Sequence, residues 1–242
     1  LKNGTFVDLK EADLHELDQV STDLDLSEKQ LDSGIIKIPG YQAFLLDSQV
    51  DDEGKSASFV DYVNDVKIVD PKRYEVPERL KTVLRPYQVE GFQWLSTLWD
   101  KGFGGILADE MGLGKSVQLL SLIEARKGNG PSLIVCPASL VLNWQEECKK
   151  FTPQLICVAV DGDAAHRAEL AKQWQNADLV VTSYDLLRRD EERYAEQAFY
   201  ACILDEAQAI KNHTTQKYKA VCGVNSLSLI HISEPTRLRR IS

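Results

Sequence analysis

The sequence predicts an α/β domain in which helices cover both faces of a parallel sheet. From residue 105 onward, short apolar runs alternate with longer amphipathic stretches. Nearly continuous apolar strands separated by helices are typical of a parallel sheet that is buried on both sides. A glycine-rich loop follows the first apolar run, and two adjacent carboxylates follow a later one. Ligands bind beyond the carboxyl ends of such strands, so both features are expected at a binding edge.

The individual elements follow from the hydrophobic periodicity. Apolar runs predict strands at 105–108, 132–136, 155–160, 178–182 and 201–204. The stretches between them predict helices at 115–127, 139–150, 164–174 and 184–197. One more helix is expected to start at Arg85-Pro86, because proline suits a first turn, and to stop at Gly102.

Residues 1–75 differ in texture and predict a small α+β accessory segment. Short β-like pieces at 5–9 and 35–38 accompany an acidic, weakly helical stretch at 9–31, and the polar residues 49–58 are typical of a linker. No catalytic constellation occurs here, so an accessory or docking role is expected. The predicted organisation is an accessory segment at 1–75, a nucleotide-binding domain at 76–226 and a separate tail at 227–242.

Charge is distributed unevenly along the chain. The net charge is −9, and residues 1–80 contain 18 acidic and 9 basic residues, whereas the remainder contains 19 of each. The motif-bearing part is therefore neutral, and composition alone gives no positive evidence for a nucleic-acid partner. No apolar run approaches the roughly 20 residues that span a bilayer, and nothing resembles a signal peptide, so no membrane partner is expected. The chain begins without Met, so residue 1 is not expected to be the natural start.

The five cysteines are widely spaced and contain no Cys-x-x-Cys pair. This pattern favours neither a zinc site nor a disulfide framework. Free thiols in apolar runs behave as small hydrophobes, so a reducing cytoplasm is the expected location.

The glycine-rich loop, 108–116, lies between an apolar run and an amphipathic stretch, which is the context of a phosphate-binding loop. Glycines let successive backbone N–H groups point inward and form an anion site at a helix N-terminus. Lys115 would reach the β- and γ-phosphates, and the Ser116 hydroxyl would bind Mg²⁺. The generic pattern has glycine five positions before Gly114, where this chain has Asp109. The alternative is a turn that only caps a helix and carries a surface lysine.

Two adjacent carboxylates follow the apolar run 200–204. Asp205 would hold the metal, and Glu206 would orient or deprotonate the attacking water. The alternative is a strand-to-helix turn with acidic capping. Together with the glycine loop, the pair predicts an ATPase in which Lys115 and Asp205 approach one Mg²⁺-bound triphosphate from neighbouring strand ends.

Several strings resemble the SWI/SNF-type branch of helicase superfamily two, and this resemblance covers about residues 80–222. They are Leu84-Arg85-Pro86-Tyr87-Gln88 with Gly91-Phe92-Gln93-Trp94-Leu95, Asp109-Glu110-Met111-Gly112-Leu113-Gly114-Lys115-Ser116, Pro137-Ala138-Ser139-Leu140 with Asn143-Trp144, Thr182-Ser183-Tyr184, and Asp205-Glu206-Ala207-Gln208-Ala209-Ile210-Lys211-Asn212. The aspartate in place of the first loop glycine is a feature of that branch. The start of the chain, 1–9, is more loosely similar to the region before the motor in bacterial members.

The resemblance implies an ATP-driven translocase on double-stranded DNA that remodels protein–DNA complexes. Such a motor has two RecA-like lobes, of which this chain carries the first, and its cofactors are ATP and Mg²⁺. Double-stranded DNA is the implied partner, RNA polymerase or another DNA-bound protein is a candidate, and the implied location is a bacterial cytoplasm, in association with the nucleoid.

The resemblance also implies roles for single residues. Gln88 would read the adenine edge with Arg85 nearby, and Gln208 would couple hydrolysis to lobe closure. Ser139 and Ser183 would lie near the DNA backbone, for which an ordinary helix cap is the alternative. The implied nucleotide-binding set within the loop is Asp109, Gly112, Leu113, Gly114, Lys115 and Ser116. Trp94 and Trp144 are assigned to core or hinge packing.

After Cys222 the family pattern would continue to a Leu-Thr-Gly-Thr-Pro string, which this chain lacks. Residues 227–242 instead resemble the translation of a transposase-type sequencing adapter and are expected to be non-native. A basic tail that binds DNA through Arg237, Arg239 and Arg240 is the alternative. Without a second lobe and its arginine finger, which is worth roughly 10³–10⁵ in turnover, we expect the fragment itself to hydrolyse ATP negligibly.

Two other functions remain open from sequence. One is a lobe of an RNA helicase of the same superfamily, and the other is a non-hydrolytic docking module with a nucleotide-shaped pocket. Stimulation by duplex DNA rather than RNA would discriminate the first, and the intact Lys115, Asp205 and Glu206 argue against the second.

Overall fold

The computed structural model describes residues 36, 42–67, 73–101, 103–108, 112–226 and 229–232. The chain divides into two compact units, residues 1–69 and residues 70–242. In each unit buried apolar side chains form a core of their own. The domain boundaries expected after residues 75 and 226 stay predictions.

The smaller unit contains helices α3 (Ala43–Gln49) and α4 (Ala57–Lys67), joined through the 3-10 turn η2 (Asp52–Gly54). The Lys55 ammonium lies 3.1 Å from Asp47 and 3.0 Å from Asp52, so ion pairs fasten this connection. The linker expected at 49–58 is the connection between α3 and α4, and it lies within the smaller unit rather than between the two units. The strands expected at 5–9 and 35–38 and the helical stretch at 9–31 lie outside the described residues, except Ile36. The buried core consists of Ala43, Leu46, Phe59 and Val63.

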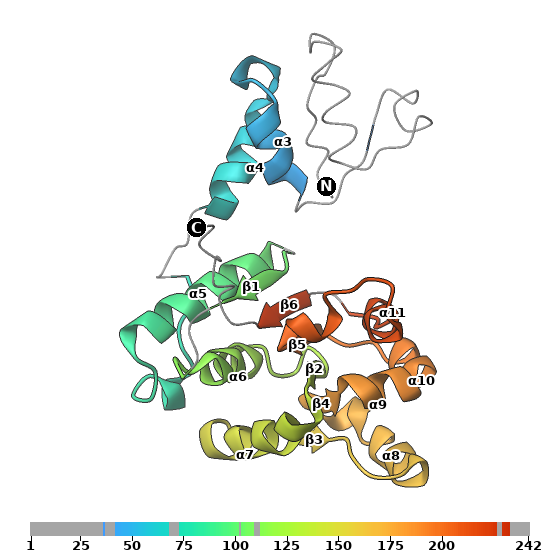
Figure 1. The fold of residues 1–242 in the computed structure, drawn as a ribbon. Helices are drawn as coiled ribbons and strands as arrows, with labels where there is room; N and C mark the ends of the chain where they lie inside the picture. Colours follow the sequence, from blue (N-terminus) through green and yellow to red (C-terminus); the bar gives the residue numbers. More distant parts are fainter. Residues whose placement is uncertain are drawn as a thin grey trace, which may run out of the picture. The chain divides into compact units, whose positions relative to one another are not determined.

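The larger unit is built on a six-stranded parallel sheet of order β1-β6-β5-β2-β4-β3 (Figure 1). Every strand expected from an apolar run is present, and every residue of β2 and β4 is buried, as a sheet covered on both faces requires. The predicted α/β class is confirmed. The strands are β1 (Gly105–Leu107), β2 (Ser132–Cys136), β3 (Cys157–Ala159), β4 (Leu179–Ser183), β5 (Ala201–Asp205) and β6 (Leu229–Ile232).

Helices cover the two faces of this sheet. Side chains alternate along β2, so Ile134 and Cys136 join one core cluster and Leu133 and Val135 join the other. The first cluster takes its helical residues from α5 to α7 and the second from α9 to α11, which lie on opposite sides of the strands in Figure 1. The helices are α5 (Pro86–Asp100), α6 (Lys115–Ala125), α7 (Val141–Phe151), α8 (Ala164–Ala171), α9 (Tyr184–Arg189), α10 (Glu191–Glu196) and α11 (Gln216–Cys222). Short 3-10 helices are η3 (Glu78–Leu80), η4 (Ala138–Leu140), η5 (Trp174–Asn176) and η6 (Ala207–Ile210).

The helix expected at 184–197 is interrupted at Asp190, which has φ −114° and ψ 29° and separates α9 from α10. The Arg167 guanidinium donates to its carboxylate through Nε at 2.6 Å and a terminal nitrogen at 3.1 Å. This hydrogen-bonded cation lowers the pKa of Asp190. Both side chains are largely buried, so the pair fixes the interruption.

Strand β6 lies within the stretch expected to be non-native. Its backbone pairs with β1 on one side and β5 on the other, and Ile232 is in register with both Leu107 and Asp205. A native and a non-native segment could both pair in this way. The pairing therefore does not test the expected non-native origin of 227–242, which stays a prediction. Residues 227–228 and 233–242, including the three arginines of the alternative basic tail, lie outside the described residues. Among the described helices, none has both the length and the apolar character that a bilayer crossing needs.

Candidate nucleotide site

The glycine loop follows β1 and leads directly into α6. Gly114, with φ 72° and ψ 45°, is the N-cap of that helix, and Gly112 has φ 83°. Both angles lie in the left-handed region, which glycine adopts without the steric cost of a Cβ. A Cβ at position 112 would meet nothing within 4 Å, so only the backbone angle calls for glycine there. Lys115 and Ser116 open the helix and are partly buried, while Asp109 lies outside the described residues.

The first turn of α5 holds this loop through one carbonyl oxygen. The Gln88 amide nitrogen donates to the Leu113 carbonyl at 2.9 Å, and the Tyr87 hydroxyl donates to the same oxygen at 3.2 Å. A Cβ at Gly114 would overlap the Gln88 amide nitrogen. The Gln88 carbonyl oxygen accepts from the Arg85 backbone N–H at 2.9 Å. Because both ends of the amide bind protein, Gln88 fastens the loop here, and its reading of adenine stays a prediction.

The acidic pair lies at the carboxyl end of β5. Asp205 is the last residue of the strand, and Glu206 follows with φ 52° and ψ 52°. Glu206 is the one non-glycine residue with positive φ in the part of the chain that the structure describes. This backbone costs a non-glycine residue about 1–2 kcal/mol, and such strain is concentrated at functional sites. The Gln208 amide donates to the Glu206 carboxylate.

Two aromatic residues orient Asp205, and sequence reasoning assigned neither of them to the site. The Trp144 indole N–H on α7 donates to the Asp205 carboxylate at 2.8 Å. The Tyr184 hydroxyl on α9 donates to the Asp205 backbone carbonyl at 2.9 Å. Both rings are buried, so the packing role expected for Trp144 is accompanied by a polar one. A buried tryptophan needs an acceptor, which was the available signal, although the sequence does not say which acceptor it finds.

The loop and the acidic pair interact electrostatically. Burial raises the pKa of the Asp205 carboxyl, and the negative charge of Glu206 adds to this rise. The hydrogen bond from Trp144 and the positive charge of Lys115 oppose it. Lys115 and Asp205 thus lie at the same edge of the sheet, since Leu107 at the end of β1 and Asp205 at the end of β5 are both in register with Ile232. The strands they follow are not neighbours, however, because β6 lies between β1 and β5.

The donor set suits Mg²⁺ rather than an all-protein metal cage. Among the described residues no group of three His, Cys, Asp or Glu side chains is arranged to hold a metal. Mg²⁺ commonly uses one or two protein oxygens together with water and substrate phosphates. The Ser116 hydroxyl and the Asp205 carboxylate would supply such oxygens, and a bound cation would favour the charged form of Asp205.

Three predicted site residues remain, namely Arg85, Ser139 and Ser183. Arg85 is exposed at the start of α5. Ser139 is exposed in η4, as a contact with the DNA backbone requires. Ser183 is buried, and its hydroxyl accepts from the Leu186 N–H at 3.2 Å as the cap of α9. The helix-cap alternative therefore describes the observed contact of Ser183.

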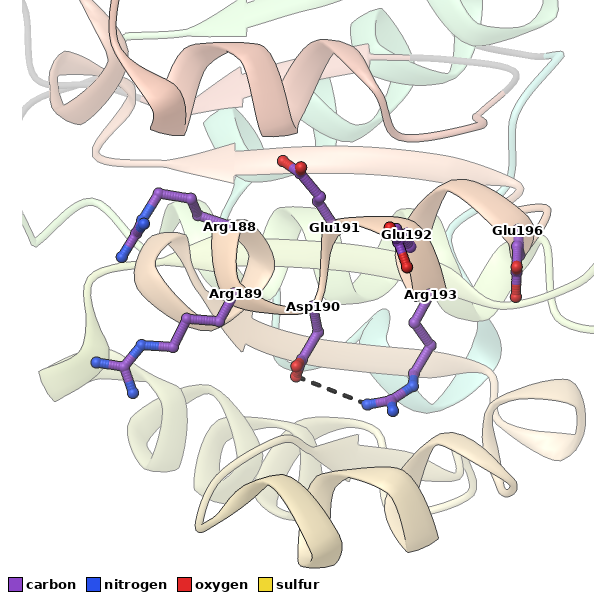
Figure 2. Close-up of a pocket in the computed structure, with 7 residues that line it drawn as sticks. All are labelled: Arg188, Arg189, Asp190, Glu191, Glu192, Arg193 and Glu196. Carbon is purple, nitrogen blue, oxygen red and sulfur yellow. Dashed lines mark ion pairs between the residues drawn. The ribbon is translucent and has the colours of Figure 1, made fainter.

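A separate hollow of about 460 Å³ lies along α9 and α10 (Figure 2). Arg188 and Arg189 extend to one side of it, while Arg193 lies 3.7 Å from Asp190, which Arg167 already binds. Its lining mixes both charges and includes no predicted site residue. It is therefore not the expected nucleotide site.

Comparison with known families agrees with this geometry. A family model described as "SNF2-related domain" matches residues 87–233, which is more than half of the chain. The chain belongs to the SNF2-related family. A second model, "Bacterial SNF2 helicase associated", matches residues 1–77. The resemblance inferred from the motif strings is confirmed.

Named relatives of this SNF2-related chain include large proteins. "TATA-binding protein-associated factor mot1" of Aspergillus fumigatus is 38% identical over 218 residues, covering 83% of this chain and 11% of its own length. "Helicase SWR1" of Candida albicans is 38% identical over 177 residues, covering 70% and 10%. "Chromatin-remodeling ATPase INO80" of Mycosarcoma maydis is 40% identical over 163 residues, covering 62% and 8%. The chain thus spans about a tenth of the length of these relatives.

Two solved structures share the fold. The chain matches "Sulfolobus solfataricus SWI2/SNF2 ATPase core in complex with dsDNA" with TM-score 0.61 and 36% identity, over 69% of this chain and 36% of that one. It matches "Sulfolobus solfataricus SWI2/SNF2 ATPase core domain" with TM-score 0.54 and 36% identity, over 68% and 32%. The family and the RecA-like fold expected from sequence are therefore established.

Proposed function

We propose that the SNF2-related unit is the ATP-binding lobe of a DNA-dependent ATPase. The observation that carries this proposal is the arrangement of one sheet edge, where the glycine loop after β1 leads into Lys115 and β5 ends at Asp205, with both strand ends level through their pairing with β6. A lysine, a hydroxyl and a buried carboxylate around left-handed glycines form the donor set that a Mg²⁺-bound triphosphate requires.

Each side chain has a proposed part in this chemistry. Lys115 would neutralise the β- and γ-phosphates, and loop N–H groups from Gly112 to Ser116 would bind phosphate oxygens. Mg²⁺ would supply Lewis-acid stabilisation of the developing phosphate charge, with Ser116 and Asp205 as its protein ligands. Glu206 would accept a proton from, or orient, the attacking water.

Gln208 is placed to transmit the state of this site. Its amide donates to the Glu206 carboxylate, so the position of Gln208 affects the orientation of the proposed base. We infer that a second lobe contacts Gln208 when it closes on the nucleotide, which would couple hydrolysis to movement. The exposed position of Gln208 is compatible with such a contact.

The proposed nucleic-acid partner is double-stranded DNA, along which the complete motor would translocate and remodel bound proteins. One matched solved structure is an ATPase core in complex with double-stranded DNA, and the names of several relatives include "helicase" or "chromatin-remodeling ATPase". Ser139 is exposed and available for a phosphate contact. The match to a model described as "Bacterial SNF2 helicase associated" supports a bacterial source, and the location that we propose is the bacterial cytoplasm.

We propose that this chain binds ATP without a second lobe but needs a second lobe to hydrolyse it. Arginine fingers supplied from outside a nucleotide-binding lobe contribute roughly 10³–10⁵ in rate. The chain of 242 residues should therefore hydrolyse ATP negligibly, with or without duplex DNA. DNA-stimulated turnover by this chain at the rate of a two-lobed motor would contradict the proposal.

The direct test is ATP binding by Lys115→Ala, measured by calorimetric titration in the presence of Mg²⁺. Loss of a charge-assisted contact costs about 1.5–3 kcal/mol, so the affinity should fall by about 10-fold to 150-fold. Lys172→Ala is the matched control, since Lys172 is an exposed lysine on the far segment after α8 that pairs only with Glu169 among the ion pairs of the described residues. Equal affinity for ATP in the two variants would contradict a phosphate-binding role.

A further inference from the structure

The strongest unexplained polar group in the larger unit is Gln118, in the second turn of α6. Its side chain is 1% exposed, and neither its carbonyl oxygen nor its amide nitrogen has a hydrogen-bond partner within the described part of the chain. An unpaired buried amide disfavours folding, whereas an apolar side chain of the same size does not. Gln118 is therefore not explained by stability of the core.

The Gln118 amide is pressed against a glycine of the neighbouring helix. A Cβ at Gly91 of α5 would overlap the Gln118 carbonyl oxygen, so a larger residue at that position requires the Gln118 side chain to move. Gly91 lies three residues after Gln88, and Gln118 lies four residues after Gly114. The contact is thus one helical turn away from the place where Gln88 meets the loop.

The two contacts are reciprocal. At the first, the amide of Gln88 on α5 lies against Gly114 of the loop, and at the second the amide of Gln118 on α6 lies against Gly91 of α5. Each amide fills the space that the missing Cβ leaves. The separation of α5 and α6 near the loop is therefore set by both contacts together.

We propose that Gln118 is a positioning residue for the nucleotide site. Through Gly91 it fixes α5 at the distance at which Gln88 and Tyr87 reach the Leu113 carbonyl, and it thereby holds the loop in its phosphate-binding conformation. This inference rests on the proposed function of the loop, and it assigns Gln118 no contact with ATP.

The first test is Gln118→Met, which keeps the length of the side chain but removes the polar end and adds flexibility. Affinity for ATP, measured by calorimetric titration with Mg²⁺, should fall about 3-fold to 10-fold, as expected for one loosened hydrogen bond to the loop. The thermal midpoint should stay equal or rise, because an unpaired amide has been removed. Wild-type affinity in this variant would overturn the proposal.

The second test asks whether the fit between positions 91 and 118 carries the effect. Gly91→Ala should weaken ATP binding by pushing the helices apart. In a Gln118→Ala background the overlap is gone, so the same Gly91→Ala change should alter ATP affinity by less than about 2-fold. An effect of Gly91→Ala that is equally large in both backgrounds, in protein that is folded by near-ultraviolet circular dichroism, would overturn the proposal.

A third measurement tests the route through Gln88. In a Gln88→Ala background, Gln118→Met should lower ATP affinity by less than about 2-fold, since its target is already absent. An undiminished effect would show that Gln118 acts elsewhere and would overturn the proposal. Failure of the wild-type chain to bind ATP would instead contradict the proposed function, so the two failures are distinguishable.

Discussion

Two turns follow strands β1 and β5, and both pass through left-handed backbone with different kinds of residue. Among the described residues after β1, the left-handed ones are Gly112 and Gly114, whereas after β5 the left-handed residue is Glu206. Glycine adopts this conformation freely, but at Glu206 the left-handed backbone costs about 1–2 kcal/mol of conformational free energy. The first turn needs only backbone N–H groups for its proposed ligand. The second must present a carboxylate, so strain persists where side-chain chemistry is required.

The largest expected effect concerns the side chain of the strained turn. In a protein that carries both lobes, Glu206→Gln should lower DNA-stimulated phosphate release by about 10²–10⁴, the range for loss of general-base catalysis. ATP affinity should change less than about 3-fold, since the volume and the polar contact to Gln208 can persist.

Glu192→Gln is the control for this change, because it removes an exposed carboxylate on α10. Normal phosphate release by Glu206→Gln would contradict the general-base role of Glu206, and the strained backbone at this position would then have no catalytic explanation.

The glycine turn should respond to a Cβ in two graded ways. Gly112→Ala adds only the cost of the left-handed angle, about 1–2 kcal/mol. Gly114→Ala adds in addition an overlap with the Gln88 amide, so a total of about 2–4 kcal/mol is expected. Denaturation by urea measures both free energies of unfolding. Equal losses would mean that Gln88 moves away freely and does not hold the loop.

The buried carboxylate of the second turn should make stability depend on pH. Burial raises the pKa of Asp205, so the folded state binds this proton more tightly than the unfolded chain does. Stability contributed by this group is therefore lost as pH rises from the ordinary aspartate value of about 3.9 through the raised value.

Asp205→Asn removes that dependence. Without nucleotide or Mg²⁺, its thermal midpoint should exceed that of the wild type at about pH 7, and the difference should disappear near the ordinary aspartate pKa. A difference that is constant with pH, measured by differential scanning calorimetry, would contradict the desolvation argument. Added Mg²⁺ and ATP should stabilise the wild type more than the variant.

The smallest expected effect is release of the strain itself. Glu206→Gly removes the left-handed cost but adds freedom to the unfolded chain, so the net gain in free energy of unfolding should be about 0.5 kcal/mol. Glu192→Gly, at a helical position, should instead lose about 1 kcal/mol. Equal losses in urea denaturation for both variants would mean that Glu206 is not strained.

The apolar runs in the sequence were sufficient to predict most strands of the sheet. Runs such as 132–136 are apolar throughout except at the first residue, and a strand buried on both faces favours that composition. Glycine spacing before Lys115 likewise predicted the turn into α6, because few other residues adopt the angles of Gly112 and Gly114.

Long-range contacts account for what the pattern missed. The break at Asp190 depends on Arg167, a partner 23 residues earlier, and residues 184–197 carry no local breaker. Trp144 meets Asp205 across 61 positions of sequence, and Tyr184 meets it across 21. The hydrophobic periodicity of α7 or of α9 does not indicate that Asp205 is the residue that each helix contacts. The position of β6 between the two site strands is also a matter of topology, which local pattern does not encode.

The interposed strand β6 sets the width of the sheet edge that carries the candidate site. Backbone hydrogen bonds hold adjacent strands about 4.8 Å apart whatever their side chains, so the ends of β1 and β5 are separated by about two such steps. Leu107 and Asp205 both align with Ile232, which puts the two ends level. Any peptide that pairs as β6 would therefore keep the same separation between Lys115 and Asp205, whether it is foreign or native. The side chains that follow β6 would differ with the sequence of that peptide.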